Sequence, residues 1–97
     1  MIRHIAFLTV KHAEDFDRTR RLLNRLCEIP HALAFEVAAN ARIDPIGDAA
    51  DIVVYGECAD EAALTAWKAN PIYDETTQVV RPLRERRWSA DFRSALS

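Results

Sequence analysis

The chain has 97 residues, of which 49% are hydrophobic and 29% charged, and its formal net charge is −2 at pH 7. This length predicts one domain over residues 1–97 and excludes a second core. The composition excludes a disordered or repetitive chain, and the negative charge argues against a general nucleic-acid-binding protein. No apolar run approaches the roughly 20 residues of a membrane helix. Because the charged start of the chain is also unlike a signal peptide, we expect a cytoplasmic protein.

Two-residue periodicity predicts the first strand, at residues 2–11. Both faces of this strand carry apolar side chains, which is typical of a strand covered on both sides. Residues 13–27 then place apolar side chains at spacings of three and four, which predicts an amphipathic helix. Its arginines fit a solvated face better than a phosphate-binding patch, because the net charge is negative. Cys27 and Cys58 lack CxxC spacing, so we expect two core thiols and no disulfide.

The middle of the chain predicts two more strands, at residues 32–40 and 51–58. The stretch between them, residues 40–50, contains Asp, Pro and Gly close together and predicts a loop. Gly56 lies inside the later strand, where a glycine often marks a bulge or a close approach to the backbone. Either a ligand or the next helix would fill that space.

Two consecutive helices are expected to meet at Asn70. Asp60 is a favourable N-cap for a helix over residues 61–69. Asn70 then caps a second helix that has Pro71 at its first position, where the missing N–H costs nothing. The sequence therefore predicts that one helix ends and another begins at the Asn70–Pro71 pair.

The second of these helices is expected to bury one stripe of side chains and to bend or end at Pro82. The predicted stripe consists of Ile72, Thr76, Val79, Val80 and Leu83. Residues 87–93 alternate again between apolar and polar side chains, which predicts a last strand. Residues 94–97 are predicted to be a frayed tail.

The resulting order, β-α-β-β-α-α-β, predicts an α+β protein of the ferredoxin-like class with a four-stranded antiparallel sheet. Helices would cover one face of this sheet only. The other face would expose more apolar area than a small monomer leaves in water, so we expect a homodimer that pairs sheet against sheet. The expected dimer interface consists of Ile5, Phe7, Val53, Tyr55, Trp88 and Phe92.

His4 is the candidate for acid–base chemistry, because its ordinary pKa is suited to proton transfer near neutral pH. Tyr73 is the candidate hydrogen-bond donor to a developing oxyanion. The alternative for His4 is a structural histidine that is hydrogen-bonded to the helix layer. A ligand pocket beside these residues is weighed against a filled core. Its expected lining consists of Ala6, Leu8, Val54, Gly56 and Trp67.

Arginines gather around the last helix and strand at Arg81, Arg84, Arg86 and Arg87. They fit an anionic ligand or a partner subunit, but a solvated or interfacial salt network is favoured. His12 has carboxylates nearby without metal-ligand spacing, so we expect no metal site. No phosphate loop or dinucleotide fingerprint is present, so no cofactor is predicted.

The chain resembles the stress-responsive α/β-barrel domain family, the dimeric α+β barrels. The resemblance is carried by MIRHIAFLTVK, IPHALAFEVAAN, DEAALTAWKANP and RPLRERRWSADF, in the family's order and at roughly its spacing. It implies that two ferredoxin-like protomers close their sheets into a barrel. It also implies that a protomer can keep a pocket between its own sheet and helices.

One branch of that family, a plant polyketide cyclase, performs an intramolecular aldol cyclisation in such a pocket. His4 matches its first-strand histidine, whereas Trp67 stands at its catalytic tyrosine and Tyr73 at its catalytic histidine. We therefore expect a homodimer that binds a small, partly apolar molecule. The alternatives are a non-catalytic structural or interaction dimer and a cyclase- or monooxygenase-like enzyme acting on a polyketide-like substrate.

Overall fold

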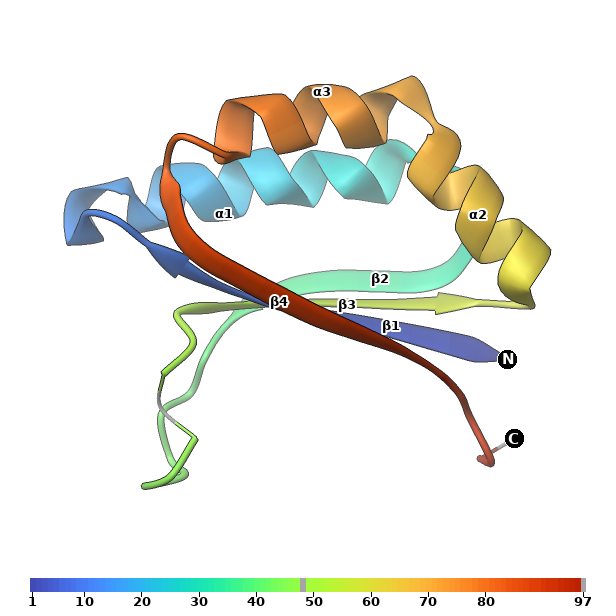
Figure 1. Ribbon diagram of the computed structural model, residues 1–97, viewed down its shortest axis with the longest axis horizontal. Coiled ribbons are helices and arrows are strands. Elements are labelled where there is room, and N and C mark those ends of the chain that lie inside the picture. The colour runs from blue at the N-terminus through green and yellow to red at the C-terminus, as the bar shows by residue number, and fades with distance from the viewer. Residues whose placement is uncertain (48, 97) are drawn as a thin grey trace.

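A computed structural model describes residues 1–47 and 49–96 and shows one sheet covered by helices on one face (Figure 1). Asp48 and Ser97, which fall in the predicted loop and tail, lie outside the described residues. The elements are β1 (Ile2–Val10), the 3₁₀ helix η1 (Ala13–Asp15), α1 (Phe16–Asn24), the 3₁₀ helix η2 (Arg25–Glu28), β2 (Ala32–Ala39), β3 (Ile52–Cys58), α2 (Glu61–Ala69), α3 (Pro71–Val80) and β4 (Arg84–Arg93).

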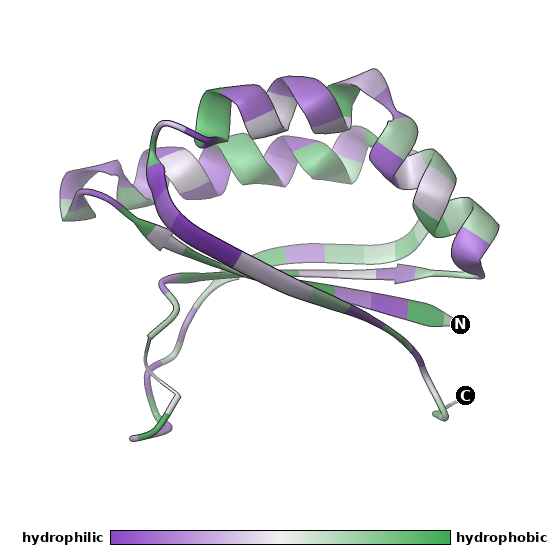
Figure 2. Cartoon of the chain, viewed as in Figure 1, coloured by the Kyte–Doolittle hydropathy of each residue, from purple (hydrophilic) through white to green (hydrophobic). Residues whose placement is uncertain are grey.

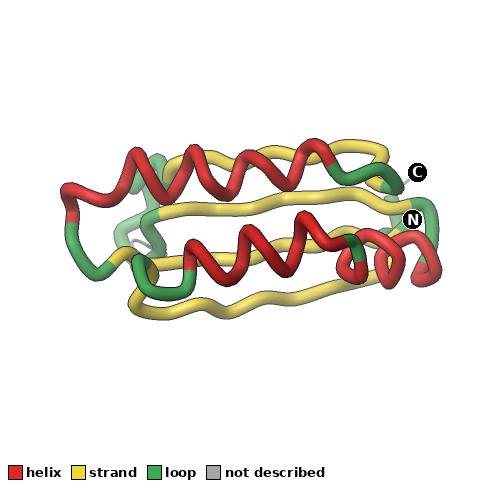
Figure 3. The backbone as a smooth tube through the Cα atoms, turned by 90° about the horizontal axis from the view of Figure 1, so that it is seen from above, coloured by secondary structure: helices red, strands yellow, loops and turns green. Residues whose placement is uncertain are grey.

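The four-stranded sheet has the order β2-β3-β1-β4, and each neighbouring pair is antiparallel. Helices α1 and α3 lie side by side above it and run roughly along the strands (Figure 3). This arrangement confirms the predicted ferredoxin-like class and the predicted order of elements. Over the part of the chain that the structure describes, no helix combines the length and apolarity needed to cross a membrane.

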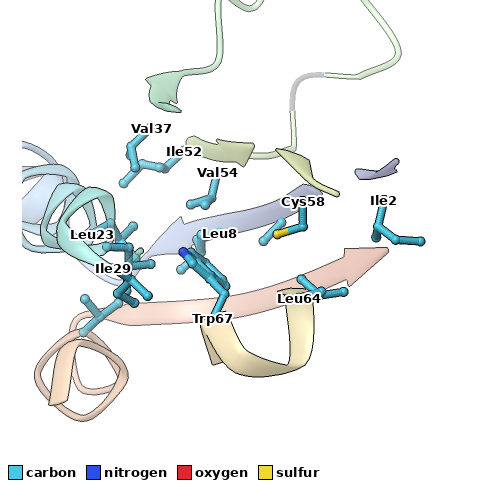
Figure 4. Packing of buried hydrophobic residues seen from close by; sticks show 13 residues of the cluster. Ile2, Leu8, Leu23, Ile29, Val37, Ile52, Val54, Cys58, Leu64 and Trp67 are labelled. Atoms are coloured by element: carbon cyan, nitrogen blue, oxygen red, sulfur yellow. The ribbon is translucent and has the colours of Figure 1, made fainter. Parts of the chain in front are cut away.

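The core lies between the sheet and the helices, because alternate residues of β1 and β3 point to the helix side (Figure 4). Helices α1 and α2 close it from above with Leu23, Leu64 and Trp67. Its buried apolar members are Ile2, Ala6, Leu8, Leu23, Leu26, Ile29, Val37, Ile52, Val54, Cys58, Leu64, Trp67 and Val80. The two central strands, β3 and β1, thus form the floor of this core.

The corner between α2 and α3 forms as the sequence predicts. The Asp60 carboxylate accepts a hydrogen bond from the Ala63 N–H at 2.8 Å and caps α2. The Asn70 side chain accepts one from the Ile72 N–H at 2.9 Å, and Pro71 opens α3. Each cap satisfies a backbone donor that has no partner within its own helix. The caps therefore fix where α3 begins above the sheet.

The structure corrects several local predictions. The single helix predicted over residues 13–27 is an α-helix between two 3₁₀ turns, and Cys27 is exposed on the second turn. Val79 is 45% exposed, because about 100° of helical rotation separates it from buried Val80. The last strand starts at Arg84, three positions before the predicted start. Its charged first residues pair with the end of β1, and their side chains conceal the strand pattern.

The sheet face away from the helices carries the side chains predicted for the dimer interface. Phe7 lies between Val53 on β3 and Trp88 on β4, and the rings of Phe7 and Trp88 stack with centroids 5.6 Å apart. Trp88 is 38% exposed and Phe92 49% exposed. We call this surface, formed by Ile5, Phe7, Val53, Tyr55, Trp88 and Phe92, the open face.

Candidate functional site

A pocket lies between the helix-facing side of the sheet and the helices above it. The space open to the centres of water molecules is about 30 Å³, which is room for roughly two waters. Strands β1, β3 and β4 form its floor, and α1, η2, α2 and α3 its walls. The lining residues are His4, Ala6, Leu8, Leu23, Leu26, Val54, Trp67, Tyr73, Thr76, Thr77, Val80, Arg84 and Arg87.

The structure brings together both proposed catalytic residues, His4 and Tyr73, and most of the proposed ligand-binding residues around this pocket. Gly56 is the exception. A Cβ atom on Gly56 would lie 3.7 Å from Cδ1 of Phe35 and 3.8 Å from the carbonyl oxygen of Ala34, which are ordinary contact distances. The space above this glycine is therefore occupied by Phe35, and Gly56 does not line the pocket.

His4 is 3% exposed and paired with a carboxylate that the sequence analysis did not assign to the site. Its Nδ1 atom lies 2.5 Å from Oδ1 of Asp91, directly across the β1–β4 pair. The other oxygen of Asp91 accepts a hydrogen bond from Nζ of Lys68 on α2 at 3.0 Å. The histidine partner is thus on the neighbouring strand, and not in the helix layer as the structural alternative for His4 supposed.

Burial lowers the pKa of His4 below its ordinary value, and this effect outweighs the opposing hydrogen bond to Asp91. For Asp91, partial burial acts to raise the pKa, but the hydrogen bonds from Lys68 and His4 act more strongly, so the pKa is lowered. A neutral imidazole thus faces an ionised carboxylate near neutral pH. In that state Nδ1–H donates to Asp91, which leaves Nε2 as the basic nitrogen.

Trp67 forms the aromatic wall of the pocket. Its ring centroid lies 5.3 Å from that of Tyr73, 5.7 Å from that of His4 and 5.8 Å from that of Phe35. In the close view of the core its indole nitrogen lies toward Leu8 and away from Leu64 (Figure 4). This wall joins α2 to the sheet and places an indole N–H beside the cavity.

Two buried polar atoms at the pocket have no hydrogen-bond partner within residues 1–47 and 49–96: Nε1 of Trp67 and Oγ1 of Thr76. Their residues are 2% and 1% exposed, and both line the pocket. Leaving a buried donor unsatisfied typically costs about 1–3 kcal/mol. Both atoms are therefore available for a hydrogen bond to water or to another molecule in the cavity.

The predicted arginine cluster divides between the two faces of β4. Arg84, which is half-buried, and Arg87 line the pocket, whereas Arg86 lies on the open face with its guanidinium 5.3 Å from the Trp88 ring centroid. Burial and the neighbouring charges of Arg87 and Arg81 lower the pKa of Arg84.

No carboxylate of the described residues lies within 4.0 Å of the Arg84 or Arg87 guanidinium, so the favoured salt network is not seen at the pocket. The arginine-rich start of β4 is strongly hydrophilic (Figure 2).

Sequence reasoning missed Asp91, Lys68 and Thr76 as members of this site. The alternation over residues 87–93 puts Asp91 on the opposite face from Trp88 and Phe92, and its meeting with His4 follows once β1 and β4 pair antiparallel. A charged residue on the core-facing side of a strand was the signal that could have found it. Among the described residues, no three His, Cys, Asp or Glu side chains gather as a metal site requires.

Comparison with known proteins places this geometry in a family. The model of the stress responsive A/B barrel domain matches residues 2–94. A Dabb-family protein of ferredoxin-like fold from Mesorhizobium loti is 26% identical with a TM-score of 0.79, covering 96% of this chain and 95% of that chain. A dimeric ferredoxin-like protein of unknown function from Jannaschia sp. CCS1 is 16% identical with a TM-score of 0.83, covering 96% and 98%. No curated protein matches the chain.

A further similar structure is that of an antibiotic biosynthesis monooxygenase. It is 21% identical to this chain, with a TM-score of 0.78, and the alignment covers 98% of this chain and 99% of that chain. The shared feature at this level of identity is the fold.

Proposed function

Because the chain belongs to the stress responsive A/B barrel domain family, we propose that it forms a homodimer through its open face and binds a small, partly apolar molecule in the pocket of each protomer. The dimer is supported by the exposed aromatic side chains of the open face and by the dimeric state named for the protein from Jannaschia. A cytoplasmic location stays a prediction from the sequence.

The observation that carries ligand binding is the pair of unpartnered polar atoms, Nε1 of Trp67 and Oγ1 of Thr76, beside an otherwise largely apolar cavity. A ligand that offers an acceptor to the indole N–H would remove the cost of the unsatisfied donor. The apolar wall formed by Leu8, Leu23 and Val80 would contact its hydrocarbon part. Such a ligand is therefore small, apolar at one side and rich in hydrogen-bond acceptors.

Binding can be tested with benzamide, a neutral aromatic probe, because the chain has only two tryptophans, which lie on opposite faces of the sheet. In ¹H–¹⁵N spectra we expect benzamide to shift the indole signal of Trp67 and to leave that of Trp88 unchanged. Ala6→Leu, which fills the pocket, should abolish the shift, whereas Ala69→Leu on the exposed surface of α2 should not. An unmoved Trp67 signal at saturating benzamide would support the non-catalytic structural dimer instead.

Acid–base catalysis is the second candidate, and the His4–Asp91 pair favours it. Asp91 holds the Nδ1–H, so Nε2 of His4 can take a proton from a carbon next to a carbonyl group. The electron pair of the broken C–H bond moves to the carbonyl oxygen and forms an enolate. The Trp67 N–H is a donor for that oxygen, and Tyr73 offers a second one from α3.

Proton abstraction can be followed without knowing the substrate, as deuterium uptake at the methyl group of acetophenone in heavy water. We expect the protein-dependent rate to rise with pH as His4 loses its proton and to level off below the ordinary histidine pKa of about 6.5, because burial lowers the pKa of His4. His4→Gln should reduce that rate by about 10²-fold or more, while His12→Gln on the exposed surface should not. Equal rates for both variants would rule out His4 as the base.

A further inference from the structure

The polar groups that line the pocket are predominantly hydrogen-bond donors. Trp67 can only donate, and its Nε1 has no partner among the described residues. The guanidinium groups of Arg84 and Arg87 carry donors and no acceptor, and one donor of Arg87 contacts Oγ of Ser89 at 3.5 Å. Thr77, a potential acceptor in the lining, already donates its hydroxyl hydrogen to the carbonyl oxygen of Tyr73 at 2.9 Å. The one basic acceptor is Nε2 of His4. This inventory fits a partner that accepts several hydrogen bonds.

The charges that line the pocket favour the same kind of partner, because Arg84 and Arg87 are both positive. Arg84 is half-buried, and its burial, followed by the charges of Arg87 and Arg81, lowers its pKa and disfavours its charged form. Arg87 lines the same pocket as His4, and its charge adds to the effect of burial, which lowers the pKa of His4. Within residues 1–47 and 49–96, no Asp or Glu forms a salt bridge with Arg84 or Arg87. An anion bound between them would relieve their repulsion.

We propose that the pocket ligand is a small organic carboxylate whose charged group is held by Arg84 and Arg87 and whose apolar part enters beside Trp67. This inference rests on the proposed ligand-binding function and adds the chemical class of the ligand. A carboxylate is planar and accepts two parallel hydrogen bonds from an arginine. Because the cavity of about 30 Å³ has room for roughly two waters, binding of such a ligand requires the side chains of half-buried Arg84 and exposed Arg87 to move outward.

Benzoate and benzamide differ in charge but little in shape, so their relative affinities measure the contribution of the carboxylate. Titrations followed at the Trp67 indole signal are expected to show benzoate binding at least about tenfold more tightly than benzamide, as hydrogen bonds to charged groups imply. Arg84→Gln and Arg87→Gln should each remove most of this preference, measured as the ratio of the two affinities within one variant. Arg18→Gln on the exposed face of α1 makes the same change in net charge and should preserve the preference.

The outcomes separate this inference from the function on which it rests. If neither compound shifts the Trp67 signal, ligand binding in the pocket is wrong. If both bind with equal affinity to the unmodified protein, the pocket binds small molecules but carboxylate recognition is overturned. The comparison within the unmodified protein decides the point even if a substitution of half-buried Arg84 prevents folding. Equal loss of preference in Arg18→Gln would assign the effect to net charge and contradict a specific site.

Discussion

Replacing Phe7 by aspartate is expected to convert the protein from a dimer to a monomer of about 11.0 kDa. Phe7 lies at the centre of the open face, between Val53 and Trp88, and stacks on the Trp88 ring. A carboxylate there would be buried against the partner without a counter-ion, which is far more costly than its exposure in a monomer. A loss on the order of 4 kcal/mol in association, as for strong interface residues, weakens the dimer about a thousandfold.

Light scattering and sedimentation at micromolar concentration measure this change directly. Val79→Asp is the matched control, because Val79 is a 45% exposed apolar residue on α3, which lies on the helix side of the sheet. This variant should remain a dimer. A monomeric unmodified protein would refute the homodimer, and a dimeric Phe7→Asp variant would show that association uses another surface.

Replacing Trp67 by alanine is expected to lower the free energy of unfolding by about 3–5 kcal/mol. Trp67 is 2% exposed and packs against His4, Phe35 and Tyr73. Its removal therefore leaves a cavity beneath α2 that is continuous with the existing pocket. Trp67→Phe should cost clearly less. It keeps much of the ring contact and removes an N–H group that has no partner among the described residues.

Chemical denaturation followed by far-ultraviolet circular dichroism gives these values, provided that all variants are compared at one protein concentration, because association contributes to stability. Trp88→Phe on the open face tests the same chemical change outside the core. If Trp67→Phe were as destabilising as Trp67→Ala, the indole N–H would have to make a stabilising contact. That result would remove the argument for an unsatisfied donor at the pocket.

Local signals in the sequence were sufficient for the elements and their order. Asp60, Asn70 and Pro71 act within one helical turn, so their roles follow from neighbouring residues alone. Phe7 and Trp88 lie on the sheet face that was predicted for them, because the two-residue period of each strand decides which face a side chain occupies. These features place the open face and most of the pocket lining.

The remaining features depend on which strands become neighbours and in what register. The meeting of His4 with Asp91 requires the exact β1–β4 pairing, which residues 87 positions apart in sequence do not reveal by themselves. The division of the arginines has the same origin. Arg84 and Arg86 would share one face of a regular strand, and the register shift opposite Thr9 and Val10 places them on different faces. From the sequence, Gly56 was expected in the pocket lining. In the structure, Phe35 of the neighbouring strand β2 occupies the space above it, and this pairing is not visible in the sequence.

Adjacent residues of β4 serve the two sides of the sheet: Asp91 holds His4, and Phe92 belongs to the open face. Because both residues belong to one continuous strand, a shift of the β4 backbone at the pocket would also displace the dimer surface. Ligand occupancy and association would then be thermodynamically linked. By reciprocity, whatever factor a ligand applies to the dimerisation constant, dimerisation applies to the affinity for that ligand.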